Sequence, residues 1–316
     1  MKISDLLSPY RCCPHLVITI GKGGVGKTTV SLLFGLMLSR IGETMVLSLD
    51  PAKHLVKYVG RDILGKEVEI ENRLVLKQLD VDREISRQLN QYSDTLKDLL
   101  PSLKVLNIDN VIDVVKFMPG VEEEVFLRII LEAYEHADYN FIVIDTPPTG
   151  VTLRTIYLPV LYKIWLEKLV EVRERILSLK YAIAKTLGRE ADIRDKALSL
   201  LLEMKEKYIN LINLLKDSTR TSYVLIATPE PLPLYELKET INFLEEKLRA
   251  KPKMLVLNRV LPLEMAERMG LKNQQENIIT ELSSYRIPMI LIKYLGKPTE
   301  SIDDIRKLED LIKVIW

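Results

Sequence analysis

The stretch Gly21-Lys22-Gly23-Gly24-Val25-Gly26-Lys27-Thr28 fits the phosphate-binding pattern G-x-x-x-x-G-K-[ST]. Glycines suit such a loop because backbone N–H groups must face phosphate oxygens at close range, where side chains would block the approach. The apolar residues 16–20 predict a short buried strand, and residues 28–41 predict a helix whose N-terminal dipole favours an anion. We therefore predict a nucleotide-binding loop; the alternative is a glycine-rich turn without a ligand.

The composition is that of a globular protein with a substantial core. The 316 residues are enough for one large domain or two small ones, and 47% of them are hydrophobic. The net charge of +1 gives no electrostatic reason to expect nucleic-acid binding. No apolar run reaches the length of a membrane span, and residues 1–15 lack the apolar core of a secretory signal. We therefore expect a cytoplasmic protein.

The two cysteines, Cys12 and Cys13, are adjacent and lie just before the first expected strand. Neighbouring cysteines rarely form an unstrained disulfide, and the sequence holds no third cysteine. Two ligands are also too few for a metal site. We interpret the pair as ordinary thiols and expect neither zinc nor an iron–sulfur cluster.

Short apolar runs bounded by turn residues alternate with helical patterns along the chain. These runs are 16–20, 45–49, 74–79, 140–145, 222–227, 253–258 and 287–292. Alternating strands and helices predict an α/β fold with a mostly parallel, doubly wound sheet. Several runs lack polar alternation, as expected where helices cover both faces. Together with the phosphate loop, this pattern predicts a sheet of the P-loop NTPase type.

Two long helix-rich segments, 82–137 and 151–216, interrupt this alternation. They contain three rows of apolar residues at spacings of three and four. The rows are Ile85, Leu89, Tyr92, Leu96, Leu99, Leu103; then Leu161, Trp165, Leu169, Val172, Ile176, Leu179, Ile183, Leu187; and beside it Leu158, Tyr162, Leu166, Val170. We predict that both segments form one helical subdomain, inserted discontinuously into an ATPase domain of residues 1–81, 138–150 and 217–316.

Two aspartates end apolar runs at the sheet edge where the phosphate loop is expected. Asp145 follows residues 141–144, and phosphate-loop enzymes hold Mg²⁺ with such an aspartate, usually through water. Asp50 follows residues 45–49 on the same rim, where a carboxylate can orient the attacking water. The alternatives are a strand-end turn for Asp145 and a helix N-cap for Asp50, with Pro51 at the first helical position.

Three further segments follow strand ends, where the base and ribose of a nucleotide would lie. They are Thr228-Pro229-Glu230, Asn258-Arg259 and Tyr294 to Pro298. An asparagine amide can both donate to and accept from the edge of an adenine. We therefore predict a base-binding pocket from these segments, with Asn258 as its strongest candidate.

Together, these motifs resemble the ArsA-type ATPases. This family includes the arsenical pump-driving ATPases and the ATPases for guided entry of tail-anchored membrane proteins. The resemblance rests on GKGGVGKTT at 21–29, DPA at 50–52, DTPPTGVTLR at 145–154 and TPEPLPLYE at 228–236, and LNR at 257–259 is compatible. The deviant phosphate loop is shared with many relatives, whereas the DTPPTGVTLR stretch is more specific. The motifs span nearly all of the sheet-forming chain.

The resemblance implies a homodimer that hydrolyses ATP. Lys27 would hold the β- and γ-phosphates, Thr28 would ligate Mg²⁺ and Thr29 would bind the α-phosphate. Lys22 would reach across a two-fold interface to the nucleotide of the partner subunit, much like an arginine finger.

The same resemblance implies roles for residues outside the loop. Asp50 would act on the attacking water beside Mg²⁺, and Asp145 would be the second Mg²⁺ anchor, partly through water. Glu230 would contact the ribose region, and Asn258 would contact the base. Pro229 and Arg259 flank these two in the expected pocket.

The sequence also departs from the family pattern. Lys53-His54 replace the usual His-Asn after DPA, and Val151 replaces the histidine of TGHTLR. Both positions lie in segments that sense the nucleotide, so switching is expected to differ in detail. The zinc-binding CxxC pair of many tail-anchored targeting members is missing, as are the separated cysteines that bind arsenite in pump ATPases.

The first functional hypothesis is a targeting ATPase for hydrophobic membrane-protein clients. A closed dimer would align its helical subdomains into a groove for a client's transmembrane helix. The expected lining is Leu161, Trp165, Leu169, Val172 and Ile176, and the alternative is that this apolar face is core. A membrane receptor and a transient peripheral association with the membrane would follow.

Two other hypotheses stay open. A motor for arsenite or anion efflux needs soft thiolate ligands, which Cys12 and Cys13 are badly placed to supply. A partitioning or positioning ATPase needs a basic DNA-binding face or a membrane-binding tail. Residues 302–316 predict a last helix that could serve as an anchor, or else dock on the sheet.

Overall fold

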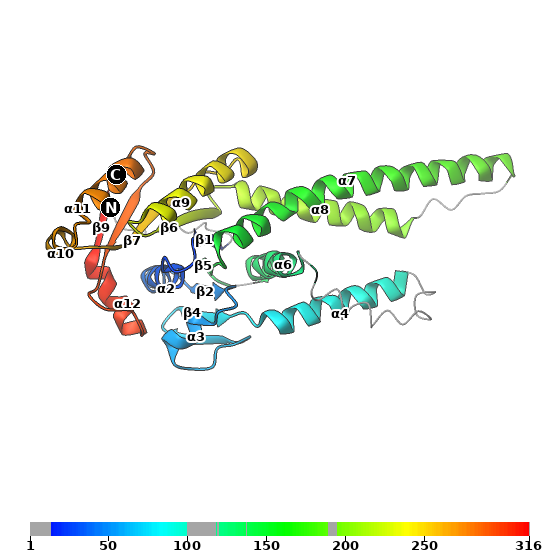
Figure 1. The fold of residues 1–316 in the computed structure, drawn as a ribbon. Coiled ribbons are helices and arrows are strands. Elements are labelled where there is room, and N and C mark those ends of the chain that lie inside the picture. Colours follow the sequence, from blue (N-terminus) through cyan, green and yellow to red (C-terminus); the bar gives the residue numbers. More distant parts are fainter. Residues whose placement is uncertain (1–13, 100–117, 119, 137, 189–194, 316) are drawn as a thin grey trace.

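A computed structural model describes residues 14–99, 118, 120–136, 138–188 and 195–315. Within these residues, nine strands form one sheet in the order β3-β4-β2-β5-β1-β6-β7-β8-β9 (Figure 1). The strands are β1 His15–Gly21, β2 Thr44–Ser48, β3 Glu67–Glu71, β4 Leu74–Gln78, β5 Phe141–Asp145, β6 Thr221–Ala227, β7 Met254–Val260, β8 Met289–Lys293 and β9 Ile312–Ile315. The helices are α2 Lys27–Leu38, α3 His54–Val59, α4 Val81–Leu99, α6 Val121–His136, α7 Thr149–Thr186, α8 Lys196–Lys216, α9 Pro231–Phe243, α10 Leu263–Arg268, α11 Lys272–Ser283 and α12 Ile302–Leu308.

The seven central strands, from β4 to β8, are parallel, and the edge strands β3 and β9 are antiparallel to their neighbours. This confirms the mostly parallel α/β sheet that the sequence predicted. The seven predicted runs correspond to the seven parallel strands. Both antiparallel edge strands were missed.

The prediction of a last helix over residues 302–316 is right at its start but wrong for its second half. Helix α12 ends at Leu308, and Ile312–Ile315 pairs with β8 as an edge strand. Ile312 and Val314 pack against one core and Ile315 against the other, which is the alternation of a strand. The segment therefore completes the sheet.

Two apolar cores lie on opposite faces of the sheet. On one face, α6, α8, α9 and α11 cover residues such as Leu16, Ile18 and Leu47. On the other face, α2, α3 and α12 cover residues such as Val17 and Val46. Neighbouring positions of β1 and β2 thus point to different cores, and both are buried. The sheet is doubly wound, as predicted.

Helices α7 and α8 run side by side and extend far beyond the sheet (Figure 1). Helix α7 has 38 residues, which correspond to about 57 Å of helix at 1.5 Å per residue. Helix α4 also extends beyond the sheet on that side, whereas α6 packs on the sheet core through Val125 and Phe126. No helix in the described ranges is long and apolar enough to cross a bilayer.

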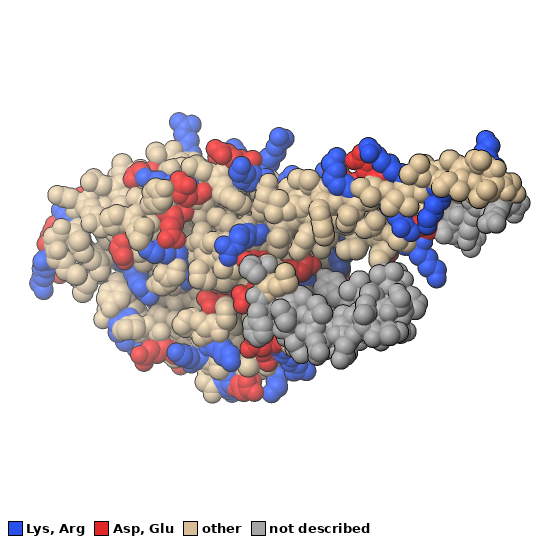
Figure 2. All heavy atoms as spheres, turned by 45° about the vertical axis from the view of Figure 1, so that its right-hand side comes forward, with Lys and Arg blue, Asp and Glu red and all other residues tan. Residues whose placement is uncertain are grey.

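Charged side chains of both signs are intermingled over the described part of the face in Figure 2. The division into an ATPase domain and a helical subdomain remains a prediction. Helices α4, α7 and α8 extend beyond the sheet, but residues such as Leu89, Ile156 and Leu215 of these helices belong to the sheet core, as α6 does.

Candidate nucleotide site

The phosphate loop connects the end of β1 at Gly21 to the start of α2 at Lys27. Gly24 and Gly26 have φ angles of +86° and +93°, which other residues rarely adopt. At Gly21 the limit is space, because a Cβ atom would lie 2.3 Å from the carbonyl oxygen of Ile226 in β6. The loop lies at the carboxyl end of the central strand, between β5 and β6, where α/β sheets bind ligands.

Asp145 joins three elements below this loop. Its fully buried carboxylate accepts hydrogen bonds at Oδ2 from Thr28 Oγ1 (2.9 Å) and Ser48 Oγ (2.8 Å). Burial raises the pKa of Asp145 to about 6, although these two hydrogen bonds and the charge of Lys27 act in the opposite direction. The strand-end turn considered as its alternative does not describe this arrangement.

The second carboxylate oxygen of Asp145, Oδ1, indicates where a ligand would bind. Among the described residues, Oδ1 has no hydrogen-bond partner although it is buried. Such an atom is costly to leave unsatisfied, which favours a ligand that supplies the partner. Carboxylate and hydroxyl oxygens together with water are the ligands that Mg²⁺ prefers. The pair of Thr28 and Asp145 therefore fits a magnesium ion or its bound water.

The two lysines of the loop have different surroundings. Lys27 is nearly buried, and its Nζ donates to the backbone oxygen of Lys22 (3.3 Å). Burial lowers the pKa of Lys27, and the carboxylates of Asp145 and Asp50 oppose this shift. Lys22 is more exposed, and its Nζ lies 3.8 Å from Oε1 of Glu236 in α9 of the same chain. Lys22 thus has an intramolecular partner in the single chain.

Asp50 is fixed at the end of β2 by local hydrogen bonds. Its Oδ1 accepts from the backbone N–H of Ala52 (2.9 Å), and Gln78 Nε2 donates to its backbone oxygen (2.8 Å). Helix α3 begins only at His54, after Lys53 in the left-handed region. The alternative of a helix N-cap at Asp50 is therefore wrong. The carboxylate is half-buried and near enough to Lys27 to act on its charge.

A cavity of about 320 Å³ lies beside the loop. It brings together three of the predicted nucleotide-binding residues, Thr29, Asn258 and Arg259, with the segment from Lys293 to Thr299. Pro229 and Glu230 do not line it. The backbone oxygen of Pro229 accepts from Gln274 Nε2 (3.0 Å), and Glu230 is exposed just before α9.

Asn258 braces the phosphate loop. Its Nδ2 donates to the backbone oxygen of Val25 (2.8 Å), and its Oδ1 accepts from the N–H of Arg259 (2.9 Å). The amide sits so close that a Cβ on Gly26 would lie 2.4 Å from Nδ2. Both ends of this amide are therefore already engaged. Its predicted contact with a base remains untested.

Sequence reasoning missed three residues that the fold brings to the site. The Tyr58 hydroxyl hydrogen-bonds with Thr29 Oγ1 (2.9 Å) and with Thr299 Oγ1 (3.0 Å), so α3 is tied to the loop and the cavity wall. Ser48 supports Asp145 from β2. Thr299 directly follows the predicted segment 294–298, which is a usable signal, whereas nothing in the pattern around Tyr58 indicates its contact.

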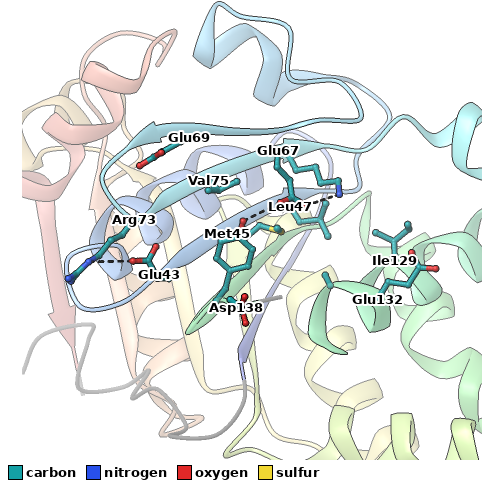
Figure 3. A pocket seen from close by; sticks show the side chains of 13 residues that line it. Glu43, Met45, Leu47, Glu67, Glu69, Arg73, Val75, Ile129, Glu132 and Asp138 are labelled. Atoms are coloured by element: carbon teal, nitrogen blue, oxygen red, sulfur yellow. Dashed lines mark hydrogen bonds and ion pairs between the residues drawn. The ribbon is translucent and has the colours of Figure 1, made fainter. Parts of the chain in front are cut away.

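A larger cavity, of about 820 Å³, lies elsewhere (Figure 3). It borders residues near the amino ends of β2 and β5, such as Glu43 and Asp138, whereas the phosphate loop is at the carboxyl ends. Its charged groups pair largely with each other, as in Arg73–Glu43 (3.6 Å) and Lys77–Glu67 (3.0 Å). The smaller cavity, which lies beside the phosphate loop, is therefore the candidate site for the rest of the nucleotide.

Comparison with known proteins identifies the family of this chain. The model of the anion-transporting ATPase (ArsA) family matches residues 15–315. The chain belongs to this family. The family assignment made from the motifs is thus confirmed, and this protein is an ATPase.

Individual relatives of this ArsA-family ATPase have modest identity. It is similar to putative arsenical pump-driving ATPase 2 of Aquifex aeolicus, with 28% identity over 270 residues that cover 84% of this chain and 87% of the relative. It is similar to ATPase ASNA1 homolog 2 of Paramecium tetraurelia, with 27% identity and coverage of 76% and 74%. It is also similar to ATPase GET3A of Arabidopsis thaliana, with 28% identity and coverage of 76% and 65%.

The brace on the loop gives a prediction for Asn258→Asp. A carboxylate would face the Val25 carbonyl where an N–H now donates, so the loop would lose its geometry for phosphates. We expect ATP affinity to fall roughly 10-fold, measured by titration with a fluorescent ATP analogue. The control Asn273→Asp, exposed on α11, should bind as the wild type does. Unchanged affinity in Asn258→Asp would contradict the bracing role.

Proposed function

We propose that this ATPase works as a Mg²⁺-dependent homodimer that captures and releases hydrophobic membrane-protein helices. The observation that carries the proposal is the long apolar face that α7 leaves exposed next to an apolar cavity. An exposed apolar face of this kind commonly marks a binding surface. The resemblance to targeting ATPases for tail-anchored proteins also supports the capture of membrane-protein helices.

The exposed face of α7 includes four of the five residues predicted for the client groove. Leu161, Trp165, Val172 and Ile176 are exposed, with 63% of the Trp165 surface accessible, and Leu169 is half-buried. The row continues with Leu179, Ile183 and Leu187, all exposed. In the neighbouring row, Leu166 and Val170 are buried. Leu158 and Tyr162 of that row are half-buried, so the neighbouring row is more buried than the predicted lining, whose exposure supports the proposal.

An apolar cavity of about 760 Å³ opens between α4, α6, α7 and α8. Ile85 and Leu89 line it from α4, and Leu158, Trp165 and Leu166 line it from α7. Of the five predicted residues, Trp165 is the one that reaches this cavity; the other four lie along α7. The rest of the first predicted row, from Tyr92 to Leu103, lies outside the residues whose side chains are described.

The chemistry proposed is attack of water on the γ-phosphoryl group. Lys27 binds the β- and γ-phosphates, Thr29 the α-phosphate, and Asp50 orients the water. Thr28 and Asp145 would hold Mg²⁺, which would supply positive charge beside the phosphates. In the dimer, Lys22 leaves Glu236 and reaches the partner's nucleotide. A charge supplied in trans makes hydrolysis depend on dimer closure.

This arrangement predicts that Lys22→Ala abolishes steady-state hydrolysis but leaves most ATP affinity intact. Cations supplied in trans contribute roughly 10³- to 10⁵-fold to the rate in related chemistry. Phosphate release and analogue binding would be measured together. Lys238→Ala, which removes a surface ion pair with Glu281, is the matched control and should hydrolyse normally. A Lys22→Ala variant with normal turnover would rule out the trans arrangement.

Asp50→Asn should trap an ATP-loaded closed dimer, because the amide cannot act as the base for water and the phosphate contacts remain. Turnover should fall at least ~100-fold, the lower range for general-base catalysis. Light scattering after size exclusion with ATP should show a dimer that persists longer than that of the wild type. A variant that hydrolyses normally, or that stays monomeric with ATP, would contradict this role.

Client capture is tested with the full chain and a tail-anchored helix. The wild type should keep the helix soluble, and Trp165→Glu should reduce retention severalfold, because a charge in the apolar surface opposes burial of the client. Ile41→Glu places the same charge on an exposed apolar position away from α7 and should have no effect. A wild-type protein that cannot retain any helix would refute the proposed function.

A second candidate, the driving of an anion pump, is favoured by the similarity to the putative arsenical pump-driving ATPase 2 of Aquifex aeolicus. It would use Cys12 and Cys13, which lie outside the described residues. ATP turnover that arsenite stimulates in the wild type, but not in a Cys12/Cys13 double alanine variant, would favour this function instead.

A further inference from the structure

The apolar cavity between α4, α6, α7 and α8 contains an unsatisfied side-chain amide. Gln88 of α4 lines the cavity and is only 1% exposed. Within the part of the chain that the structure describes, neither its Oε1 nor its Nε2 has a hydrogen-bond partner. A buried amide without partners destabilises a protein, and native structures rarely leave both of its ends unpaired.

The neighbours of Gln88 offer no compensation. Ile85, one helical turn earlier, and the adjacent Leu89 are buried apolar residues. Three polar side chains line the other walls, but none of them hydrogen-bonds Gln88. Tyr208 donates to Glu124 Oε1 (3.2 Å), and the ring of Tyr162 packs against that of Tyr208. Gln88 is therefore a polar group placed in an apolar lining, and its partner is expected to come from the occupant.

We infer that Gln88 selects client helices that carry one hydroxyl or amide side chain, such as Ser, Thr or Asn, on the face turned to α4. This inference rests on the proposed function, because it assigns the occupant of the same cavity. A hydroxyl both donates and accepts, so it can satisfy either end of the amide. In the client, a polar residue that faces the apolar lining needs the same bond.

The cavity can adapt to such a contact. The side-chain amide of Gln88 is buried in the wall of the cavity, so an occupant must displace neighbouring side chains to reach it. Met118 and Met204 line the same cavity, and methionine is flexible enough to repack around different occupants. Trp165 on the rim is largely exposed and has room to move.

The experiment uses the full chain with fluorescent peptides of one Leu-rich transmembrane helix. One peptide is all-Leu, and four others carry a single Ser at successive central positions, which samples every face of the helix. Retention of each peptide in a soluble complex is measured by fluorescence anisotropy. We expect the wild type to bind the best Ser peptide roughly 3- to 20-fold more tightly than the all-Leu peptide.

Two variants separate polarity from packing. Gln88→Met keeps the length of the side chain without its amide and should prefer the all-Leu peptide or bind all peptides alike. Leu89→Met changes a neighbouring apolar residue and should keep the wild-type preference. Without peptide, Gln88→Met should unfold at the same or a higher temperature, because it removes an unsatisfied buried amide.

The possible failures are distinguishable. If the wild type retains all peptides equally and Gln88→Met does the same, selection by Gln88 is refuted while client capture stands. A clear drop in the unfolding temperature of Gln88→Met would also refute it, because the amide would then have a structural partner in the free protein. If the wild type retains no helix at all, both the proposed function and this inference fail.

Discussion

The fully buried carboxylate of Asp145 is the constraint on which the nucleotide site depends. It sits at the end of β5 and draws together Thr28 from the phosphate loop and Ser48 from β2 through one oxygen. Burial of a charge is costly, and the site compensates only one side of this carboxylate. The other side is the natural place for a cation or its water. The two carboxylate oxygens of Asp145 thus connect the phosphate loop, the edge of the sheet and the expected ion.

The rest of the site holds the loop backbone in a shape that favours phosphate. Asn258 supports it from β7, and the contact between Gly21 and β6 leaves no room for a side chain. Lys27 remains close to carboxylates and to the loop's own backbone. A bound triphosphate would therefore enter a site in which the buried Lys27 is already in place, whereas Lys22 would still have to leave Glu236.

The helical extension adds a second kind of surface to the same chain. Helix α7 begins directly after Asp145 and Thr146-Pro147-Pro148, so a short connection joins it to β5, which ends at Asp145. Its first turns are buried at Thr152 and Ile156, and its later turns expose the apolar row. A shift at the end of β5 would therefore reach the start of α7 directly, and Pro159, which removes one backbone hydrogen bond of the helix, lies between these turns and the exposed apolar row. This continuity gives a physical route by which the proposed hydrolysis could act on the proposed client surface.

The sequence by itself determined the phosphate loop, the seven parallel strands, the family and the position of Asp145, because these depend on local patterns. Glycine spacing requires a loop, and unbroken apolar runs require strands buried on both faces. Only the tertiary structure decided which residues far apart in the sequence come into contact. The bracing by Asn258, the Tyr58 contact with Thr29 and the pairing of Lys22 with Glu236 join residues 29 to 233 positions apart. The last strand was misread as a helix for the same reason: the short run Ile312–Ile315 becomes a strand because β8 offers an open edge, and no local pattern records that edge.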